Sequence, residues 1–310
     1  IPKLPTMYDE PFADSSQIPT HLISELARKH VTVALSGDGG DELFAGYNRY
    51  IQAEKHWRII SAVPINFRKL LSESMMSVRG DFIEKLYNRF EFLVPMKSRI
   101  SLPAEKYQKA AQVISMSGIN EVYKRLVSII YMPENYASHG TESTSLLDNT
   151  DLCNYSRDFV STMQKLDLLT YLPDDLLVKI DRASMAVSLE TRVPFLDHKV
   201  VEFVMKLPLE LKLHNGQSKR LLRQVLYRYV PEELIERPKM GFSVPIGLWL
   251  KGPLKDWAGS LIDESRLVSE GYFKSEPVLK MWDDHVKGRA NWDHQLWNIL
   301  IFQGWSANYS

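Results

Sequence analysis

The chain has 310 residues, of which 45% are hydrophobic and 25% are charged, a composition that predicts one large globular domain or two. Lys plus Arg and Asp plus Glu both number 38, so the net charge is zero and no overall field attracts the chain to nucleic acid or an anionic membrane. No apolar run has the length of a membrane span, and Cys153 is the only cysteine, which excludes an internal disulfide. We therefore expect a protein of a reducing compartment, the cytoplasm.

The first predicted unit consists of a helix over residues 19–29, a strand over 31–35 and a helix over 41–55. Pro19 suits the first turn of a helix, where its missing N–H costs little. The strand is apolar throughout, which predicts burial on both faces. A lone strand needs parallel neighbours, and few candidates follow it in the sequence, so we expect its partners to lie upstream of Ile1.

A glycine-rich loop, Ser36-Gly37-Asp38-Gly39-Gly40, ends this strand. Asp41 and Glu42 then open the next helix, where the helix dipole favours negative charge. A strand, a glycine-rich loop and a helix N-terminus in this order are typical of a nucleotide site in an α/β protein. A tight turn capped by Asp41 is the simpler interpretation, but the cluster of carboxylates favours a bound cation with a phosphate.

Helical spacing dominates the remainder of the chain. It predicts helices over 158–172, 174–189 and 198–205, a surface loop over 133–150 and another loop over 190–197. We interpret Lys179 as a solvated charge in an ion pair. The tryptophans of the C-terminal third are expected in the core, and the histidines lack metal-ligand spacing.

A further amphipathic helix is predicted to open at Lys219-Arg220-Leu221, and a loop shaped by two prolines and a glycine follows over residues 237–245. Within this loop, Arg237 and Lys239 could offer cations to an anionic ligand. A basic surface loop is the alternative interpretation.

Four long motifs, found in order, resemble the synthetase domain of the glutamine-dependent asparagine synthetases: SGDGGDELFAGYNRY, LPDDLLVKIDRASMAVSLETRVPFLD, NGQSKRLLR and RPKMGFSVPIGLWL. The resemblance extends from about Asp9 to the C-terminus. It implies an α/β fold that is mostly helical in this chain, with a partial adenine-nucleotide-hydrolase-like (Rossmann-like) parallel sheet and a large helical region. The expected division is a nucleotide-site part over 1–56 and a helical part over 57–310.

The resemblance also implies a reaction and its participants. ATP, with Mg²⁺, adenylates the side-chain carboxylate of aspartate and releases pyrophosphate. Ammonia from a glutaminase domain then attacks the β-aspartyl-AMP, which gives asparagine and AMP. A homodimer is a possible assembly, and neither nucleic acid nor a membrane is an expected partner.

The residues that match the family's motifs take on roles by this resemblance. Asp38 corresponds to an acidic residue near the reacting acyl carbon, where many members have Glu, and Asp41 to a carboxylate that holds Mg²⁺. Lys239 corresponds to a lysine that contacts pyrophosphate and stabilises the adenylation transition state. The remaining implied contacts are with the nucleotide, for Ser36 and Gly37, and with aspartate, for Asp174 and Asp175.

Two family features are absent from the sequence. The pyrophosphate loop S-G-G-x-D-S does not occur, and Cys153 is not the N-terminal nucleophile of a glutaminase domain. We therefore interpret the chain as the C-terminal part of a longer enzyme, inactive by itself. Two alternatives remain: the same adenylation of another carboxylate, as in β-lactam synthetases and lasso-peptide cyclases, or a non-catalytic helical interaction module.

Overall fold

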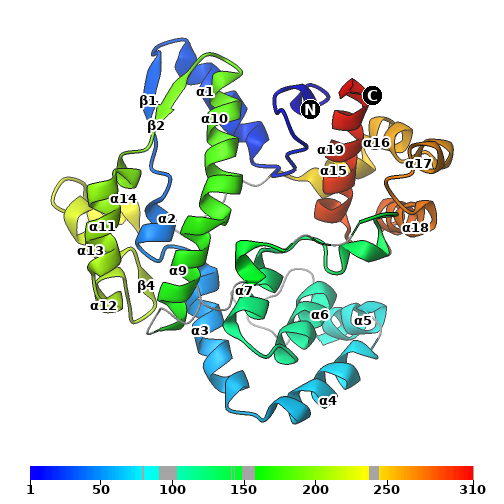
Figure 1. Ribbon diagram of the computed structural model, residues 1–310, viewed down its shortest axis with the longest axis horizontal. Helices are drawn as coiled ribbons and strands as arrows, with labels where there is room; N and C mark the ends of the chain where they lie inside the picture. Colours follow the sequence, from blue (N-terminus) through cyan, green and yellow to red (C-terminus); the bar gives the residue numbers. More distant parts are fainter. Residues whose placement is uncertain are drawn as a thin grey trace. The chain divides into compact units, whose positions relative to one another are not determined.

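The structure, a computed structural model, describes residues 1–78, 80–90, 103–140, 142, 144–148, 158–236 and 244–309. It is 66% helical with a small parallel sheet, which confirms the expected mostly helical α/β class (Figure 1). The chain forms two compact units. Unit 1 comprises Ile1–Gln52, Thr144–Leu248 and Trp297–Ser310, and unit 2 comprises Ala53–Ser143 and Trp249–Leu296. The expected division of the chain into a nucleotide-site part over residues 1–56 and a helical part over residues 57–310 stays a prediction.

The regular elements of unit 1 include two short sheets and a set of helices and turns. The strands are β1 (Val33–Leu35), β2 (Glu190–Arg192), β3 (Leu213–His214) and β4 (Gln217–Ser218). The helices and helical turns are η1 (Leu4–Thr6), α1 (Gln17–Arg28), α2 (Gly40–Leu43), η5 (Leu146–Asp148), α9 (Phe159–Leu169), η6 (Leu172–Leu177), α10 (Val178–Met185), η7 (Pro194–Leu196), α11 (His198–Lys206), α12 (Leu209–Lys212), α13 (Arg220–Leu226) and α14 (Glu232–Ile235).

The described elements of unit 2 are all helical. They are α4 (Ile65–Met76), α5 (Gly80–Phe90), α6 (Pro103–Ile114), α7 (Ile119–Val127), η4 (Pro133–Asn135), α16 (Lys255–Leu261), α17 (Glu264–Glu270) and α18 (Ser275–Val286). Three helices contain residues of both units: α3 (Asn48–Ser61), α15 (Ile246–Lys251) and α19 (Asp293–Tyr309). No helix in the described part of the chain is both long and apolar enough to cross a bilayer.

Strand β1 pairs in parallel with β2, with Val33 opposite Glu190 and Leu35 opposite Arg192, and the two strands lie side by side in Figure 1. The expectation that residues 190–197 form only a loop is therefore wrong. Burial of the first strand on both faces is also wrong, because Val33 is 38% and Leu35 is 74% exposed. In the described residues, β2 is the single strand paired with β1, and the side chains of Val33 and Leu35 are exposed on one face of β1.

Helices α1 and α10 pack against each other beside this sheet (Figure 1). Small side chains of α10 make the close approach possible, since Ala183 and Ser184 are both buried. His21 of α1 reaches the carbonyl oxygen of Ala183, with a distance of 3.2 Å from Nδ1 to O. The apolar side chains of α1 at Leu22 and Leu26 are each 58% exposed, so they contribute little to this contact.

The helix predicted over 41–55 is interrupted. Helix α2 ends at Leu43, Ala45 has a left-handed φ of 53°, and α3 begins at Asn48. The amide of Gly46 donates to the carbonyl oxygen of Asp41 at 2.7 Å, a bond that closes the turn between the two helices. The sequence-based prediction joined them because the apolar spacing continues across the break.

One further expectation needs correction, and one hairpin was not predicted. The helix predicted over 174–189 starts as the π-helical turn η6 and continues as α10, which ends at Met185. Strands β3 and β4, which the sequence analysis did not predict, form an antiparallel hairpin around Asn215 and Gly216, both with positive φ. The helix expected after this hairpin is present as α13, with Lys219 at its N-cap position.

The core beneath the candidate site lies in unit 1. Leu43 and Phe44 pack with Val204 of α11, and Phe195 and Leu196 cover them. Of the six tryptophans expected in the core, Trp297 is almost fully buried, at 1% exposure, while the other five are partly exposed. The segment 133–150 contains the short turns η4 and η5, in keeping with the surface loop predicted there.

Candidate active site

The glycine-rich loop starts at the carboxyl end of β1, where the Ser36 amide donates to the Arg192 carbonyl oxygen at 2.8 Å. The Ser36 hydroxyl donates to Asp38 Oδ2, and the Asp38 amide donates back to Ser36 Oγ at 3.2 Å. These bonds fold the two side chains onto the loop. A Cβ added at Gly37 would meet nothing within 4 Å, so the backbone at this position faces open space that a ligand could approach.

Gly39 and Gly40 fix the loop to the core. Gly39 has a left-handed φ of 79°, and a Cβ there would lie 2.5 Å from the Leu196 side chain. A Cβ on Gly40 would meet the Phe195 ring at 3.4 Å. Only glycine allows the left-handed backbone of Gly39 together with such close packing against η7, whereas Gly37 faces open space.

Asp41 and Lys219 form the main ionic contact of the loop. Lys219 Nζ lies 3.1 Å from Asp41 Oδ2, and both side chains are 26% exposed. The Lys219 amide also donates to the Phe44 carbonyl oxygen at 3.0 Å. A Cβ on Gly46 would overlap both Asp41 Oδ1 and Lys219 Cε, so glycine at this position leaves the space that the pair occupies.

Glu42 points away from this pair into the interior. It is fully buried and accepts a hydrogen bond from the Tyr47 hydroxyl. Burial raises the pKa of Glu42, and the Tyr47 hydrogen bond only partly offsets that effect. Gln164 of α9 is also fully buried and donates from Nε2 to the carbonyl oxygen of Leu43 at 3.0 Å. Among the described residues, neither the second carboxyl oxygen of Glu42 nor the Gln164 side-chain oxygen has a hydrogen-bond partner.

Arg49 occupies an aromatic cage directly after the loop. Its guanidinium carbon lies 4.0 Å from the centre of the Tyr47 ring and 4.8 Å from that of Tyr171. Arg49 also forms an ion pair with the fully buried Asp167, at 2.7 Å, and the Tyr50 hydroxyl donates to the same carboxylate. Cation–π contacts and a buried ion pair therefore connect the glycine-rich loop to α9 and to the residue that precedes η6.

The two aspartates expected to contact substrate lie in the π-helical turn η6. Such turns are rare and frequently mark functional sites. Burial and the nearby Asp14 carboxylate raise the pKa of Asp175 to about 6, against the opposing charges of Lys179 and Arg49. Lys179 pairs with Asp14 at 2.8 Å, but its side chain is only 12% exposed, so it is not the solvated charge that we expected.

The ion pair between Asp14 and Lys179 also changes the pKa of Asp14. Although burial by itself would raise the pKa of Asp14, the charge and hydrogen bond of Lys179 lower it overall. The N-terminal segment is held on α10 at a second point, where Arg182 lies 2.9 Å from Asp9. These contacts place one ionised acid, Asp14, beside Asp175.

The donor atoms for Mg²⁺ are few. No group of three or more metal-ligating side chains occurs among the described residues. Mg²⁺ commonly takes one or two protein carboxylates together with substrate phosphates and water. Asp41 fits that mode as a single ligand beside a bound triphosphate, and the adjacent Lys219 fits a phosphate-rich neighbour.

Some predicted site residues cannot be compared with this geometry. Lys239 and Arg237 fall outside the described residues, as does Cys153. The structure brings Ser36, Gly37, Asp38 and Asp41 together in one loop, and it puts Asp174 and Asp175 in η6.

Several residues of this region have contacts that the sequence alone did not predict. Lys219 lies within the NGQSKRLLR motif, but neither helical spacing nor composition connects it to Asp41. Arg49 and Asp167 are likewise distant in sequence. The sequence does contain one local signal for a buried pair. Asp167 is a charged residue within the apolar stripe of α9.

Known proteins resemble this chain over nearly its whole length. The family model for asparagine synthase matches residues 1–307. The chain is 34% identical to asparagine synthetase [glutamine-hydrolyzing] 1 of Bacillus subtilis (strain 168) over 310 residues, covering 99% of this chain and 45% of that protein. It is also 34% identical over 311 residues to a putative asparagine synthetase of Mycobacterium tuberculosis (strain ATCC 25618 / H37Rv), covering 99% of this chain and 44% of that protein.

A glycine-rich loop at the carboxyl end of a strand in a small parallel sheet, within a mostly helical chain, is the architecture of an α/β protein. With the family match over nearly its whole length, this chain belongs to the asparagine synthase family. The chain spans less than half the length of these two relatives.

Proposed function

We propose that this chain forms the C-terminal part of an ATP-dependent ligase that makes asparagine from aspartate and ammonia. The loop over residues 36–46, with Asp41 next to Lys219 at the carboxyl end of β1, is the observation that carries the proposal. When a carboxylate attacks a phosphate, neutralisation of the negative charges contributes more to catalysis than a covalent intermediate with the protein would. A glycine loop with a cation and a metal-type carboxylate provides that environment.

Two steps make up the reaction. An oxygen of the aspartate side-chain carboxylate attacks the α-phosphorus of ATP, a new P–O bond forms, and pyrophosphate leaves with the electrons of the broken P–O bond. Ammonia then attacks the acyl carbon of β-aspartyl-AMP and loses a proton. The C–O bond to AMP breaks, and asparagine and AMP are released.

The loop residues bind and orient the nucleotide. The Gly37 backbone faces open space, which suits close approach by the α-phosphate, and Ser36 lies beside it. Asp41 would hold Mg²⁺, which when bound neutralises phosphate charge. Lys219, next to Asp41, is a candidate second cation for the phosphates, and Lys239 is proposed to contact the departing pyrophosphate.

Asp38 and the acids of η6 are assigned to the second substrate. Asp38 is proposed to lie near the acyl carbon, where a carboxylate can accept the proton that ammonia loses. Asp174 and Asp175 are proposed to line the aspartate pocket. The raised pKa of Asp175 supports this role, because a bound ammonium group would stabilise its ionised form and supply the missing counter-charge.

ATP–pyrophosphate exchange by the full-length protein tests the proposal. Aspartate should support exchange, whereas glutamate and succinate should give far less. Exchange that prefers another carboxylic acid would favour the alternative acceptor chemistry, and no exchange with any acid would favour the non-catalytic interaction module. The 310-residue chain by itself should form no AMP with aspartate, ATP, Mg²⁺ and ammonia.

Lys239 gives a sharper test of the assigned roles. Lys239→Ala in the full-length protein should slow adenylation by roughly a hundredfold to a thousandfold, while ATP binding changes little, since the contact strengthens as pyrophosphate leaves. Asp38→Ala should leave ATP binding intact and impair formation or capture of the acyl-adenylate. Near-parental rates for both variants at saturating substrate would contradict the roles but not the fold.

A further inference from the structure

Arg49 links the glycine-rich loop to the turn η6, which contains Asp174 and Asp175. Its guanidinium carbon lies 4.0 Å from the ring centre of Tyr47, which follows the loop, and 4.8 Å from the ring centre of Tyr171, which directly precedes η6. The two tyrosine rings also meet edge to face, with their centres 6.0 Å apart. One arginine side chain therefore contacts both segments.

The position of Arg49 is itself fixed by its neighbours. Its Nη2 atom lies 2.7 Å from Asp167, a fully buried carboxylate of α9 that also accepts a hydrogen bond from the Tyr50 hydroxyl. Tyr47 is held in turn by Glu42, which accepts the hydrogen bond of its hydroxyl. A planar guanidinium can pair with a carboxylate in its plane while its faces contact aromatic rings, a combination that lysine cannot reproduce. The loop and α9 thus hold this cation at a defined place.

Turn η6 is a segment in which the backbone by itself makes fewer bonds than a regular helix. Pro173 has no amide hydrogen, so the turn lacks one bond that a continuous α-helix would have, and the segment forms a π-helical turn between α9 and α10. Among the described residues, the Tyr171 hydroxyl makes no hydrogen bond. The ring contacts with Arg49 and Tyr47 are therefore the interactions that orient this side chain at the start of η6.

The placement of η6 decides where the Asp175 carboxyl group lies. Asp175 is partly buried, and among the described residues it forms neither a hydrogen bond nor an ion pair. Its carboxyl group is therefore positioned by the backbone of the turn and not by side-chain partners. Burial raises the pKa of Asp175 and the charge of Arg49 opposes this effect, so the guanidinium and the carboxyl group are near each other. A shift of the turn would move this carboxyl group relative to the loop.

We propose that Arg49 is a positioning residue for the aspartate site and that it acts through Tyr171 on the turn that carries Asp175. The guanidinium fixes η6 relative to the glycine-rich loop, so that an amino acid bound by Asp175 presents its side-chain carboxylate to a nucleotide bound at the loop. Arg49 contacts neither substrate. This inference rests on the proposed ligase function, in which the two segments hold the two reactants of the adenylation step.

The test is ATP–pyrophosphate exchange by the full-length enzyme, with separate KM values for aspartate and ATP. Arg49→Met and Tyr171→Leu should each raise the KM for aspartate roughly tenfold or more, because a displaced Asp175 binds the ammonium group of aspartate poorly, while the KM for ATP changes by less than about twofold. Tyr171→Phe keeps the ring and should have much the smaller effect. A purely structural role would lower the amount of active enzyme and leave both KM values unchanged.

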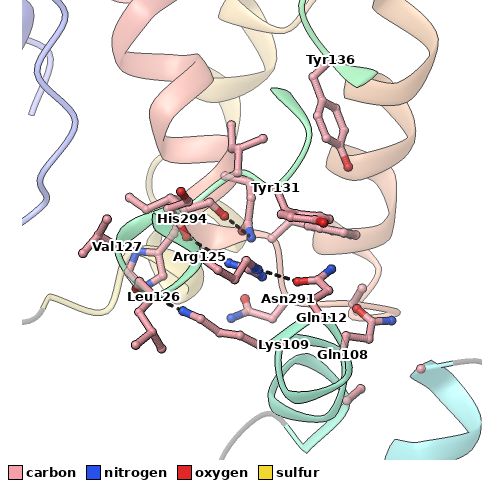
Figure 2. A pocket seen from close by; sticks show the side chains of 18 of the residues that line it. Gln108, Lys109, Gln112, Arg125, Leu126, Val127, Tyr131, Tyr136, Asn291 and His294 are labelled. Carbon is pink, nitrogen blue, oxygen red and sulfur yellow. Dashed lines mark hydrogen bonds between the residues drawn. The ribbon is translucent and has the colours of Figure 1, made fainter. Parts of the chain in front are cut away.

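A double variant and a matched control complete the test. If Arg49 acts through Tyr171, the double variant Arg49→Met with Tyr171→Leu should raise the KM for aspartate no further than the more severe single variant. The control is Arg125 in the wall of a pocket of unit 2, where its guanidinium carbon lies 5.1 Å from the ring centre of Tyr131 (Figure 2). Arg125→Met removes a contact of the same kind and should leave the KM for aspartate within about twofold of the parental value.

Three outcomes would overturn the inference. They are a parental KM for aspartate in both single variants, an equal rise of this KM in Arg125→Met, and multiplicative effects of Arg49→Met and Tyr171→Leu in the double variant. Each of them leaves the proposed function intact if the parental enzyme shows aspartate-dependent exchange, whereas no such exchange by the parental enzyme would overturn the function and the inference together. If Arg49→Met fails to fold, the two Tyr171 variants and Arg125→Met still decide.

Discussion

Lys219 Nζ lies 3.1 Å from Asp41 Oδ2, so the residue at the N-cap of α13 contacts the first turn of α2. Two segments far apart in the sequence thereby form one charged surface at the end of β1. If Asp41 holds Mg²⁺ with substrate phosphates, the metal and Lys219 share this carboxylate.

We therefore expect Asp41→Asn in the full-length enzyme to raise the Mg²⁺ concentration that half-saturates adenylation by about tenfold or more, since an amide is a poorer ligand for a hard cation. Lys219→Met should lower the adenylation rate with a smaller effect on the Mg²⁺ requirement. Mg²⁺ titrations of ATP–pyrophosphate exchange measure both effects. An unchanged Mg²⁺ dependence in Asp41→Asn would remove this residue from the metal site.

Gly46 is predicted to be essential for the same pair. A Cβ at this position overlaps Asp41 and Lys219, so Gly46→Ala should destabilise the fold by about 1–3 kcal/mol, the usual cost of overpacking. Gly37→Ala in the neighbouring glycine-rich loop is the control, since a Cβ there meets nothing within 4 Å. Urea unfolding of both variants gives the comparison, and equal stability of the two would show that the loop relaxes without cost.

The pKa of Glu42 is predicted to be higher in the folded state than in the unfolded chain, because the carboxyl is buried. A folded pKa above the unfolded value means that this residue's contribution to stability falls as the pH rises. Glu42→Gln keeps the shape without the charge, so its stability relative to the parent should improve between pH 4.5 and pH 8, a range that begins near the ordinary glutamate pKa of about 4.3.

Glu42→Ala serves as the contrast. It removes the partner of the Tyr47 hydroxyl and leaves a cavity, so it should be about 2–4 kcal/mol less stable than Glu42→Gln at every pH. Urea unfolding across the pH range separates the two variants. A glutamine variant that loses stability relative to the parent as the pH rises would mean that the buried carboxyl is ionised.

The ion pair between Arg49 and Asp167 is predicted to support the loop through burial. Arg49→Met removes an ion-pair partner from the Asp167 carboxylate, which is buried at 0% exposure, and this should cost about 3–5 kcal/mol. The double variant Arg49→Met with Asp167→Leu should recover part of this loss, as a double-mutant cycle by chemical denaturation can establish. Additive losses in the cycle would mean that the two residues are energetically independent.

Asp175 is predicted to show a pH dependence of the same sign as Glu42, over a range that its pKa defines. Its pKa rises from 3.8 to about 6 on folding, so its contribution to stability is full below pH 4 and is lost as the pH rises to 6. Asp175→Asn should therefore match the parent at pH 4 and exceed it at pH 7.5 by on the order of 2 kcal/mol. In the full-length enzyme the same variant should bind aspartate more weakly. A constant stability difference across this range would mean that Asp175 titrates normally.

The comparison of sequence and structure is clearest around β1. Alternation and glycine chemistry predicted the strand and its loop, because both depend on a few neighbouring residues. The apolar spacing also predicted one helix in place of α2 and α3, because the spacing continues across Ala45 and does not reveal its left-handed φ. It also classed residues 190–192 as a loop, since a three-residue strand is too short to show a period.

The sequence by itself determined the helical content, the position of the glycine-rich loop and, through four ordered motifs, the resemblance to asparagine synthetases. Only the tertiary structure decided that β2 pairs with β1, that Lys219 meets Asp41, and that Glu42 and Asp167 are buried. The physical reason is the separation in sequence between the residues that determine each feature. Turns and helix starts are set by local backbone preferences, whereas ion pairs, parallel pairing and burial depend on segments that meet only when the whole unit folds.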